Sequence, residues 1–335
     1  MHDQSSSPTH KNVILIVNLG TPDTPTYWST MRYLQEFLSD RRVIEIPKAI
    51  WYPILYGFIL PFRSLSSSKK YLRVFDQQKG LPLRYLTQDL VRGINDNLNK
   101  QYNNVECIMA MRYGNPHISK IMQSLANSYV KNLYILPLFP QYSATTTATI
   151  MDIVGDELKK WRYVPNIQFI HGFWDNPIYI KTICNNILAH WKHHERAEKL
   201  LLSFHGLPER NLQKGDPYYC LCQKTSRLIA QKLKLNENEY EVVFQSRFGP
   251  SKWLQPYTED RLIALGKQGI KKLDIIAPGF IVDCLETDDE IANEYAEIFE
   301  EAGGESLHYI PAMNASPTSV NFFTEYIKDT ATFNA

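Results

Sequence analysis

The chain has 335 residues, of which 44% are hydrophobic and 21% are charged, a composition typical of a globular protein with enough apolar material for two domains. Its 36 Lys and Arg residues nearly balance its 35 Asp and Glu residues, so no global positive field directs it to nucleic acid. The five cysteines are scattered and odd in number, and no secretory signal precedes them, which favours a reducing compartment. We therefore expect a cytoplasmic protein that does not bind nucleic acid.

Short apolar, β-branched runs alternate with segments of helical pattern along the chain. Each run ends in a loop that contains Gly, Pro or Asn, and this alternation of strand and helix predicts a parallel sheet covered on both faces. The runs are residues 12–22, 105–116, 132–143, 167–177, 198–208, 240–250, 272–286 and 305–317. Four runs followed by four runs predict an α/β protein of two tandem units, each a four-stranded parallel sheet flanked by helices.

These runs also set the expected domain limits. We expect an N-terminal α/β domain over residues 11–160, a C-terminal α/β domain over 161–317 and a last helix over 318–335. Residues 1–10 are polar and are expected to be disordered. No low-complexity linker marks the division between the two domains.

The most apolar segment is residues 46–62. Only 14 residues separate Lys48 from Arg63, and Pro53 and Pro61 interrupt them, so the segment is too short and too broken to span a bilayer. Two interpretations remain open at this point. The segment is either a buried helix or an apolar lip around a ligand mouth that also touches membrane.

Four carboxylates follow the apolar run at 273–282. Asp283, Glu286, Glu290 and Glu294 stand at spacings of three, four and four, which place them on one face of a helix. Like charges at this spacing repel, so the arrangement costs stability unless a cation or a proton lies among them. The alternative is an ordinary acidic helix whose N-terminus is capped by Asp283.

Chemically useful side chains follow the ends of other predicted strands. His205 ends one run, Arg112 and Tyr113 end another, and Ser246 with Arg247 ends a third. Ligands of open parallel sheets bind at the carboxyl ends of the strands, so two facing sheets would enclose one cleft lined by these groups. Imidazole with carboxylate suits a borderline divalent ion such as Fe²⁺. Dinucleotide, Walker-type and serine-nucleophile motifs are absent from the sequence.

Six segments together carry a resemblance to a known family. They are NLGTP, MRYGNP, PLFPQYS, LLSFHGLPERNLQKGDPYY, VVFQSRFGPSKWLQPYTED and GFIVDCLETDDEI. With these segments the chain, from about residue 12 to 325, resembles the ferrochelatases of bacterial type, which insert Fe²⁺ into a porphyrin to make haem. The resemblance implies two tandem Rossmann-like, chelatase-type domains with the active cleft between them.

The resemblance also implies roles for individual residues. His205 and Glu286 match the family's catalytic and metal-binding pair, on opposite sides of the cleft. Asp283, Glu290 and Glu294 match a path for protons or metal on an acidic helix that contains a π-helical turn. The residues expected to contact the porphyrin are Leu19, Tyr71, Arg112, Tyr113 and Trp253.

The implied reaction is the last step of haem biosynthesis, in which a lyase joins protoporphyrin IX and ferrous iron and releases two protons. Coproporphyrin III or another tetrapyrrole remains an alternative substrate, and a non-catalytic porphyrin or haem carrier is a third interpretation. The family uses residues 46–65 as a lip that admits porphyrin, so peripheral membrane contact is expected. The sequence does not separate Fe²⁺ from Zn²⁺ or a monomer from a homodimer.

Several positions depart from the family pattern. Leu81 replaces a hydroxyl near the propionates, Phe139 replaces a tyrosine, and Cys284 replaces a second histidine that eukaryotic members have, where we expect an inert thiol. Ala144 stands at the position of a cluster cysteine of animal members. No [2Fe–2S] cluster and no other permanently bound cofactor are therefore expected. Cys220 and Cys222 form a pair whose spacing is a weak metal signal.

Overall fold

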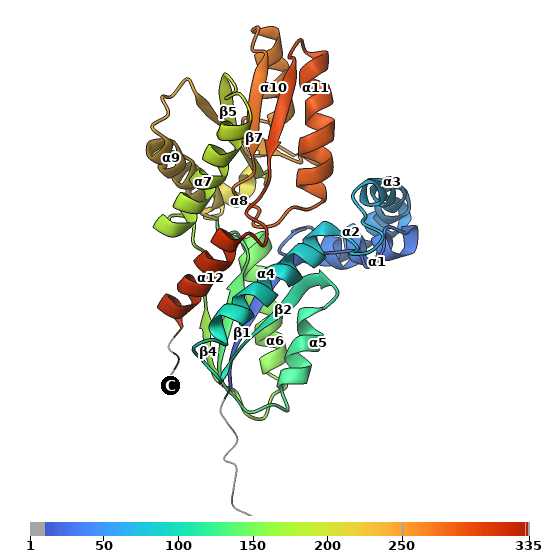
Figure 1. Ribbon diagram of the computed structural model, residues 1–335. Coiled ribbons are helices and arrows are strands. Elements are labelled where there is room, and N and C mark those ends of the chain that lie inside the picture. The colour runs from blue at the N-terminus through green and yellow to red at the C-terminus, as the bar shows by residue number, and fades with distance from the viewer. Residues whose placement is uncertain (1–10, 250, 332, 334–335) are drawn as a thin grey trace, which may run out of the picture.

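Two four-stranded parallel sheets form the framework of the molecule, which is described by a computed structural model over residues 11–249, 251–331 and 333 (Figure 1). The first sheet has the order β2-β1-β3-β4 and the second β6-β5-β7-β8, so both units have the same topology. The strands are β1 (Lys11–Thr21), β2 (Val105–Gly114), β3 (Val130–Pro137), β4 (Asn166–Phe169), β5 (Lys199–His205), β6 (Tyr240–Gln245), β7 (Lys272–Ile276) and β8 (Ser306–Ile310). Each predicted run overlaps one strand, and the predicted tandem α/β fold is confirmed.

Helices cover both faces of each sheet. Because a strand of such a sheet has no solvent face, its sequence is almost continuously apolar, and Val13 to Val17 of β1 are all fully buried. The helices of the two units and their connections are α1 (Tyr27–Ser39), α4 (Pro82–Leu98), α5 (Ile118–Leu125), η2 (Ala144–Ala148, π-helical), α6 (Thr149–Leu158), α7 (Pro177–His193), α8 (Glu209–Gln213), α9 (Tyr218–Leu233), α10 (Thr258–Lys267), η3 (Glu286–Glu294, π-helical), α11 (Tyr295–Glu301) and α12 (Pro317–Thr330).

The two units share one apolar core. One cluster of buried side chains runs from Leu90 on α4 to Ile183 on α7 and Phe322 on α12, and α12 packs against both α4 and α7 (Figure 1). The expected division at residue 160 precedes β4, which pairs with β3, so the first sheet extends to Phe169. The expected last helix begins at Pro317 and ends at Thr330. The expected disorder of residues 1–10 lies outside the described residues.

The apolar segment forms a broken helix on the surface. It comprises α2 (Lys48–Ile54), the π-helical turn η1 (Leu55–Ile59) and α3 (Leu60–Arg73). Its buried side chains form one stripe at spacings of four, five, four, four and three, namely Trp51, Leu55, Leu60, Ser64, Ser68 and Tyr71. The five-residue step is the π turn, where the Leu60 amide bonds to the Leu55 carbonyl just before Pro61, which has no amide hydrogen.

The opposite face of this segment is exposed and apolar. Phe58 is 67% and Phe62 73% exposed, and Ile50, Tyr56 and Leu65 are exposed beside them. The interpretation as a buried helix is therefore wrong, and residues 46–65 form a surface lip, the name used from here on. None of the helices described is both long and apolar enough to cross a membrane.

Gly20 lies where β1 approaches β2 at the edge of the interdomain pocket. Its φ is +111°, and a Cβ atom there would lie 1.7 Å from the carbonyl oxygen of Tyr113. No side chain fits that space, so the glycine of NLGTP serves close strand approach and a positive φ. Gly20 thereby sets the direction of the chain at the end of β1, where Gly20 and Thr21 line the pocket described below.

Candidate active site

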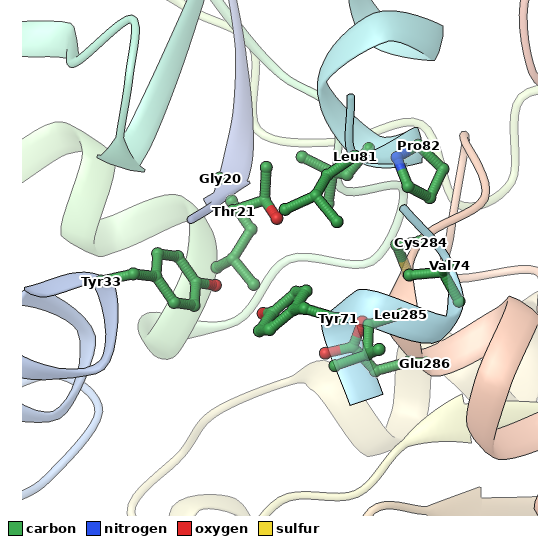
Figure 2. A pocket seen from close by; sticks show the side chains of 12 residues that line it. Gly20, Thr21, Tyr33, Tyr71, Val74, Leu81, Pro82, Cys284, Leu285 and Glu286 are labelled. Atoms are coloured by element: carbon green, nitrogen blue, oxygen red, sulfur yellow. The ribbon is translucent and has the colours of Figure 1, made fainter. Parts of the chain in front are cut away.

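A pocket lies between the two units, at the carboxyl end of β1. It is lined by Leu19, Gly20, Thr21, Tyr33, Tyr71, Val74, Leu81, Pro82, Leu83, Cys284, Leu285 and Glu286. Figure 2 shows Tyr33, Tyr71 and Glu286 extending towards the same space from α1, α3 and η3. Its free volume is only about 10 Å³, enough for about one water molecule. This pocket is therefore far too small to hold a porphyrin in this structure.

Glu286 lies in the first turn of η3 and faces two phenols. The pKa of Tyr71 is raised by its burial and then by the charge of Glu286, and the pKa of Tyr33 is raised by burial, by Tyr71 and by Glu286. The rings of Tyr33 and Tyr71 meet edge to face at 6.3 Å. Both phenols are therefore neutral near pH 7, and Glu286 is the one Asp or Glu residue among those that line the pocket.

His205 is the last residue of β5, and its imidazole interacts electrostatically with Glu286. Burial lowers the pKa of His205, the charge of Glu286 opposes this effect, and Arg63 of the lip lowers the pKa further. The hydroxyl of Tyr218 donates to the His205 carbonyl at 3.0 Å and fixes the end of the strand. His205 is consequently a neutral imidazole near neutral pH, the form that accepts a proton.

Trp253 lies beside the end of β5. A Cβ atom on Gly206 would lie 2.8 Å from the Gln245 carbonyl oxygen and 3.2 Å from the indole ring, so a larger residue would force the backbone of β6 or the indole to shift. A β-bridge between Pro208 and Trp253, and the bond from the Leu254 amide to the Leu207 carbonyl at 2.8 Å, hold the two loops together. Trp253 therefore neighbours His205, although neither lines the closed pocket described above.

The acidic helix is π-helical over nine residues, as the family resemblance implies. The Tyr295 amide bonds to the Glu290 carbonyl five residues earlier, which is the π-helical pattern. This wider turn compensates for the sideways drift of acids spaced by four residues on an α-helix.

The side chain of Asp283 does not point along the same face as the other acids but binds to Tyr309 and to the loop after β8. Its carboxylate accepts hydrogen bonds from Tyr309 Oη at 2.5 Å, from Asn314 Nδ2 at 2.6 Å and from the Ala312 amide at 3.1 Å. No side chain caps η3, whose N-cap position is Leu285. The capping interpretation for Asp283 is therefore wrong, because this carboxylate ties the start of η3 to the loop after β8.

Glu290 and Glu294 have separate partners. The carboxylate of Glu290 accepts from Ser246 Oγ at 2.6 Å and from Tyr295 Oη at 2.7 Å, and burial raises its pKa. Glu294 pairs with Lys70 at 2.7 Å and with Arg73 at 3.2 Å, both from the end of α3. The repulsion predicted among these acids is thus relieved by two cations and two hydroxyl donors.

Arg73 also pairs with Asp289 at 2.9 Å, and the Asp289 side chain is only 1% exposed. Burial raises the pKa of Asp289, and the charge of Arg73 opposes the rise. A carboxylate with a raised folded-state pKa loses stability as pH rises, and removing Arg73 enlarges that loss. We expect Arg73→Ala to lower the free energy of unfolding by about 1 kcal/mol at pH 8 and by much less at about pH 3, where Asp289 is largely protonated in both the folded and the unfolded state.

Urea titrations at the two pH values measure this difference. Lys69→Ala is the matched control, because Lys69 is an exposed cation of the same helix that forms no ion pair within the described part of the chain. An equal loss at both pH values, or the same loss in Lys69→Ala, contradicts the assignment.

Arg112 and Tyr113 do not line the pocket. Arg112 pairs with Asp40 and donates to Thr149 Oγ1 at 2.7 Å, and the hydroxyl of the fully buried Tyr113 donates to Asp40 at 2.9 Å. Both side chains have a structural role in this structure, and their expected contact with porphyrin stays a prediction. The reason is that the nearly buried carboxylate of Asp40 requires a cation and hydrogen-bond donors.

Four residues around the site were not predicted from the sequence. Tyr33 lines the pocket, Lys70 and Arg73 neutralise the acidic helix, and Arg63 lies near His205 with its guanidinium stacked on Phe248 at 4.0 Å. Arg63 lies in the lip, and Lys70 and Arg73 follow it in the sequence, and this proximity was the one signal that could have identified these cations.

The positions that depart from the family pattern have different surroundings. Leu81 and Cys284 line the pocket, and burial followed by the charge of Glu286 raises the pKa of the Cys284 thiol, which is therefore neutral. Phe139 packs against the core of the first unit. Cys220 is exposed whereas Cys222 is buried, so the pair does not present two thiols to one ion.

The chain was compared with protein families, with individual proteins and with solved structures. The family model described as Ferrochelatase matches residues 11–331. The chain is 44% identical over 315 residues to Ferrochelatase 2 of Shewanella oneidensis, covering 94% of this chain and 96% of that protein. It is also 44% identical to the ferrochelatase of Marinobacter nauticus, covering 94% and 85%. Among solved structures, SirB from Bacillus subtilis with Fe³⁺ has a similar fold, with a TM-score of 0.57, 11% identity and coverage of 96% of both chains.

Proposed function

This chain belongs to the ferrochelatase family, and from that premise we propose that it inserts Fe²⁺ into protoporphyrin IX to form protohaem, with release of two protons. It is a lyase that inserts iron into porphyrin for haem synthesis. The choice of protoporphyrin IX rests on the apolar lip, which suits the less carboxylated of the candidate porphyrins.

The observation that carries the mechanism is the electrostatic pair of His205 and Glu286. A porphyrin carries two pyrrole N–H protons that must leave before the metal is bound by four nitrogens. Buried, neutral His205 accepts a pyrrole proton, and the nearby charge of Glu286 stabilises the imidazolium that forms. Trp253 on the His205 side and Tyr71 on the Glu286 side supply aromatic surface for the macrocycle.

The remaining acids are suited to the transfer of protons or Fe²⁺ between the pocket and solvent. Glu290 follows Glu286 by four residues on η3 and is half-buried with a raised pKa, and Glu294 lies further along η3 with two cations beside it. We assign Glu290 and Glu294 to a path for protons or Fe²⁺. Asp283 holds the start of this helix in place, and its three hydrogen bonds make it a positioning residue.

Anaerobic incubation with protoporphyrin IX and Fe²⁺ tests the proposal through the change in absorbance from free porphyrin to metalloporphyrin. Coproporphyrin III in a parallel reaction decides the substrate, since faster turnover of it would replace protoporphyrin IX. Folded protein that binds haem tightly but produces none would be a carrier, which would overturn the enzymatic assignment.

We also propose that the protein is cytoplasmic and contacts membrane peripherally through the lip. Several large apolar side chains project together from this segment, and a patch of this kind marks an interaction surface. Lys48, Lys69 and Arg63 lie in or near the segment and would favour anionic lipid. Porphyrins are poorly soluble in water, so a lip that touches lipid would collect substrate from it.

We expect the double variant Phe58→Ser, Phe62→Ser to reduce co-sedimentation with vesicles of phosphatidylcholine and phosphatidylglycerol by about tenfold or more, because two exposed rings leave the interface. Tyr129→Ser is the matched control, since Tyr129 is 68% exposed but lies outside the lip. Equal binding of the double variant and the wild type would exclude the lip as the contact.

A further inference from the structure

A cluster of titratable side chains lies in the second unit, away from the pocket. Asp274 stands in the middle of β7, and His308 is its register partner on β8, so both side chains emerge on one face of the sheet. His190 is contributed by the last turn of α7, which packs against that face. One ligand atom from each of the three residues lies within 4.8 Å of the others.

The carboxylate of Asp274 is an unusual group at this position. Its side chain is 1% exposed in an otherwise apolar strand, and burying a charge without compensation is costly. Trp191 Nε1 donates to Oδ2 at 2.7 Å, and the Ala197 amide donates to the same oxygen at 3.3 Å. These donors fix the orientation of the carboxylate and leave Oδ1 towards the histidines.

Three atoms in the cluster have no hydrogen-bond partner among the described residues, namely Asp274 Oδ1, His190 Nε2 and His308 Nδ1. Both ring nitrogens lie 3.5 Å from Oδ1. Two ligand atoms about 2.0–2.1 Å from a tetrahedral ion are about 3.3–3.4 Å apart, close to the separations observed. The two ring nitrogens therefore lie at ligand-set spacing from Oδ1, and all three atoms are within 4.8 Å of one another, close enough to bind one ion.

We propose that Asp274, His190 and His308 bind one divalent transition-metal ion of the Zn²⁺ or Fe²⁺ class, at a site distinct from the pocket where iron insertion takes place. Two imidazoles and one carboxylate suit such ions. The bonds from Trp191 and Ala197 hold the ligating carboxylate as outer partners do in metal sites. Water completes the coordination. The exposed ring of His194 stacks on His190 at 4.4 Å.

The ion would join the end of α7 to the centre of the second sheet. Because it binds only the folded arrangement of β7, β8 and α7, it stabilises that unit by mass action. The role is structural, since none of its three ligands lines the pocket.

The test uses the full-length chain carrying His205→Ala and Glu286→Gln, so that the insertion site does not contribute to binding. After treatment with a chelator, Zn²⁺ is titrated against a chromophoric chelator, and the melting temperature is recorded with and without Zn²⁺. We expect one tightly bound equivalent and a higher melting temperature. Asp274→Asn and His308→Ala should each weaken binding by about 100-fold or more and abolish the thermal shift.

His193→Ala is the matched control, because His193 is exposed on the same turn of α7 and is not one of the three ligands. It should retain the bound equivalent. If Asp274→Asn fails to fold, the half-exposed His308 provides the decisive variant. Absence of bound Zn²⁺ in the parent chain, or unchanged affinity in His308→Ala, overturns the proposal in favour of a metal-free cluster of one carboxylate and two imidazoles. Neither result depends on chelatase activity.

Discussion

Replacing His205 with alanine should lower kcat for iron insertion by about 10²–10⁴-fold, the range expected when a general base is lost. Burial keeps this imidazole neutral, and none of the residues that line the pocket is a histidine that could replace it. Anaerobic assays with protoporphyrin IX and Fe²⁺ measure the rate.

Porphyrin binding is the control for this variant. Macrocycle contacts with Trp253 and Tyr71 do not require the imidazole, so fluorescence titration with protoporphyrin IX should give a dissociation constant within a few-fold of the wild-type value. A His205→Ala enzyme with more than a tenth of wild-type kcat would remove this residue from the base role.

Replacing Glu286 with glutamine should lower kcat by about 100-fold, because a preorganised charge near the developing imidazolium is lost. It should also move the pH profile. The active form of His205 is neutral, so kcat/KM rises with pH through the pKa of His205 and then levels off, with the acid limb below the ordinary histidine value of about 6.5. Glu286 raises that pKa, so its neutralisation moves the acid limb to lower pH.

Profiles of wild type and Glu286→Gln between pH 5 and 8 test the sign of this shift. Asp283→Asn serves as a comparison, since Asp283 bonds to Tyr309 and Asn314 and its charge is not among the influences on His205. An acid limb that stays in place, or moves upward, in Glu286→Gln would show that the two groups do not interact during the reaction.

The positions of the strands could be predicted because a sheet covered on both faces leaves a signal within each strand's own sequence. A strand buried on both faces needs a continuous apolar run. Each of the eight runs in the sequence marks the position of one strand. The end of such a run is less certain. The apolar stretch from Leu273 continues to Val282, but β7 ends at Ile276, since Pro278 has no amide hydrogen for a ladder bond.

The site was only partly predictable, because several of its contacts join distant segments. The row of acids was visible in the sequence, but its cations come from α3, with Lys70 and Glu294 separated by 224 positions. Asp283 has the expected spacing from Glu286, but its carboxylate binds Asn314. The spacing of residues in the sequence cannot reveal such a contact. Tyr113 lies at the end of a strand as expected. Its side chain is nevertheless buried in the core, where its hydroxyl donates to the nearly buried carboxylate of Asp40.

The small pocket has a consequence for the kinetics of substrate capture. A porphyrin is far larger than the space for about one water molecule among the residues that line this pocket. We therefore expect α3 to move away from η3 before a porphyrin can enter beside Tyr71 and Glu286. If the open fraction is about 1%, the apparent dissociation constant is about 100-fold weaker than the intrinsic one. The ion pairs of Arg73 and Lys70 join α3 to η3 and would oppose this opening, so the observed association rate should reach a plateau at high porphyrin concentration, at the rate of opening.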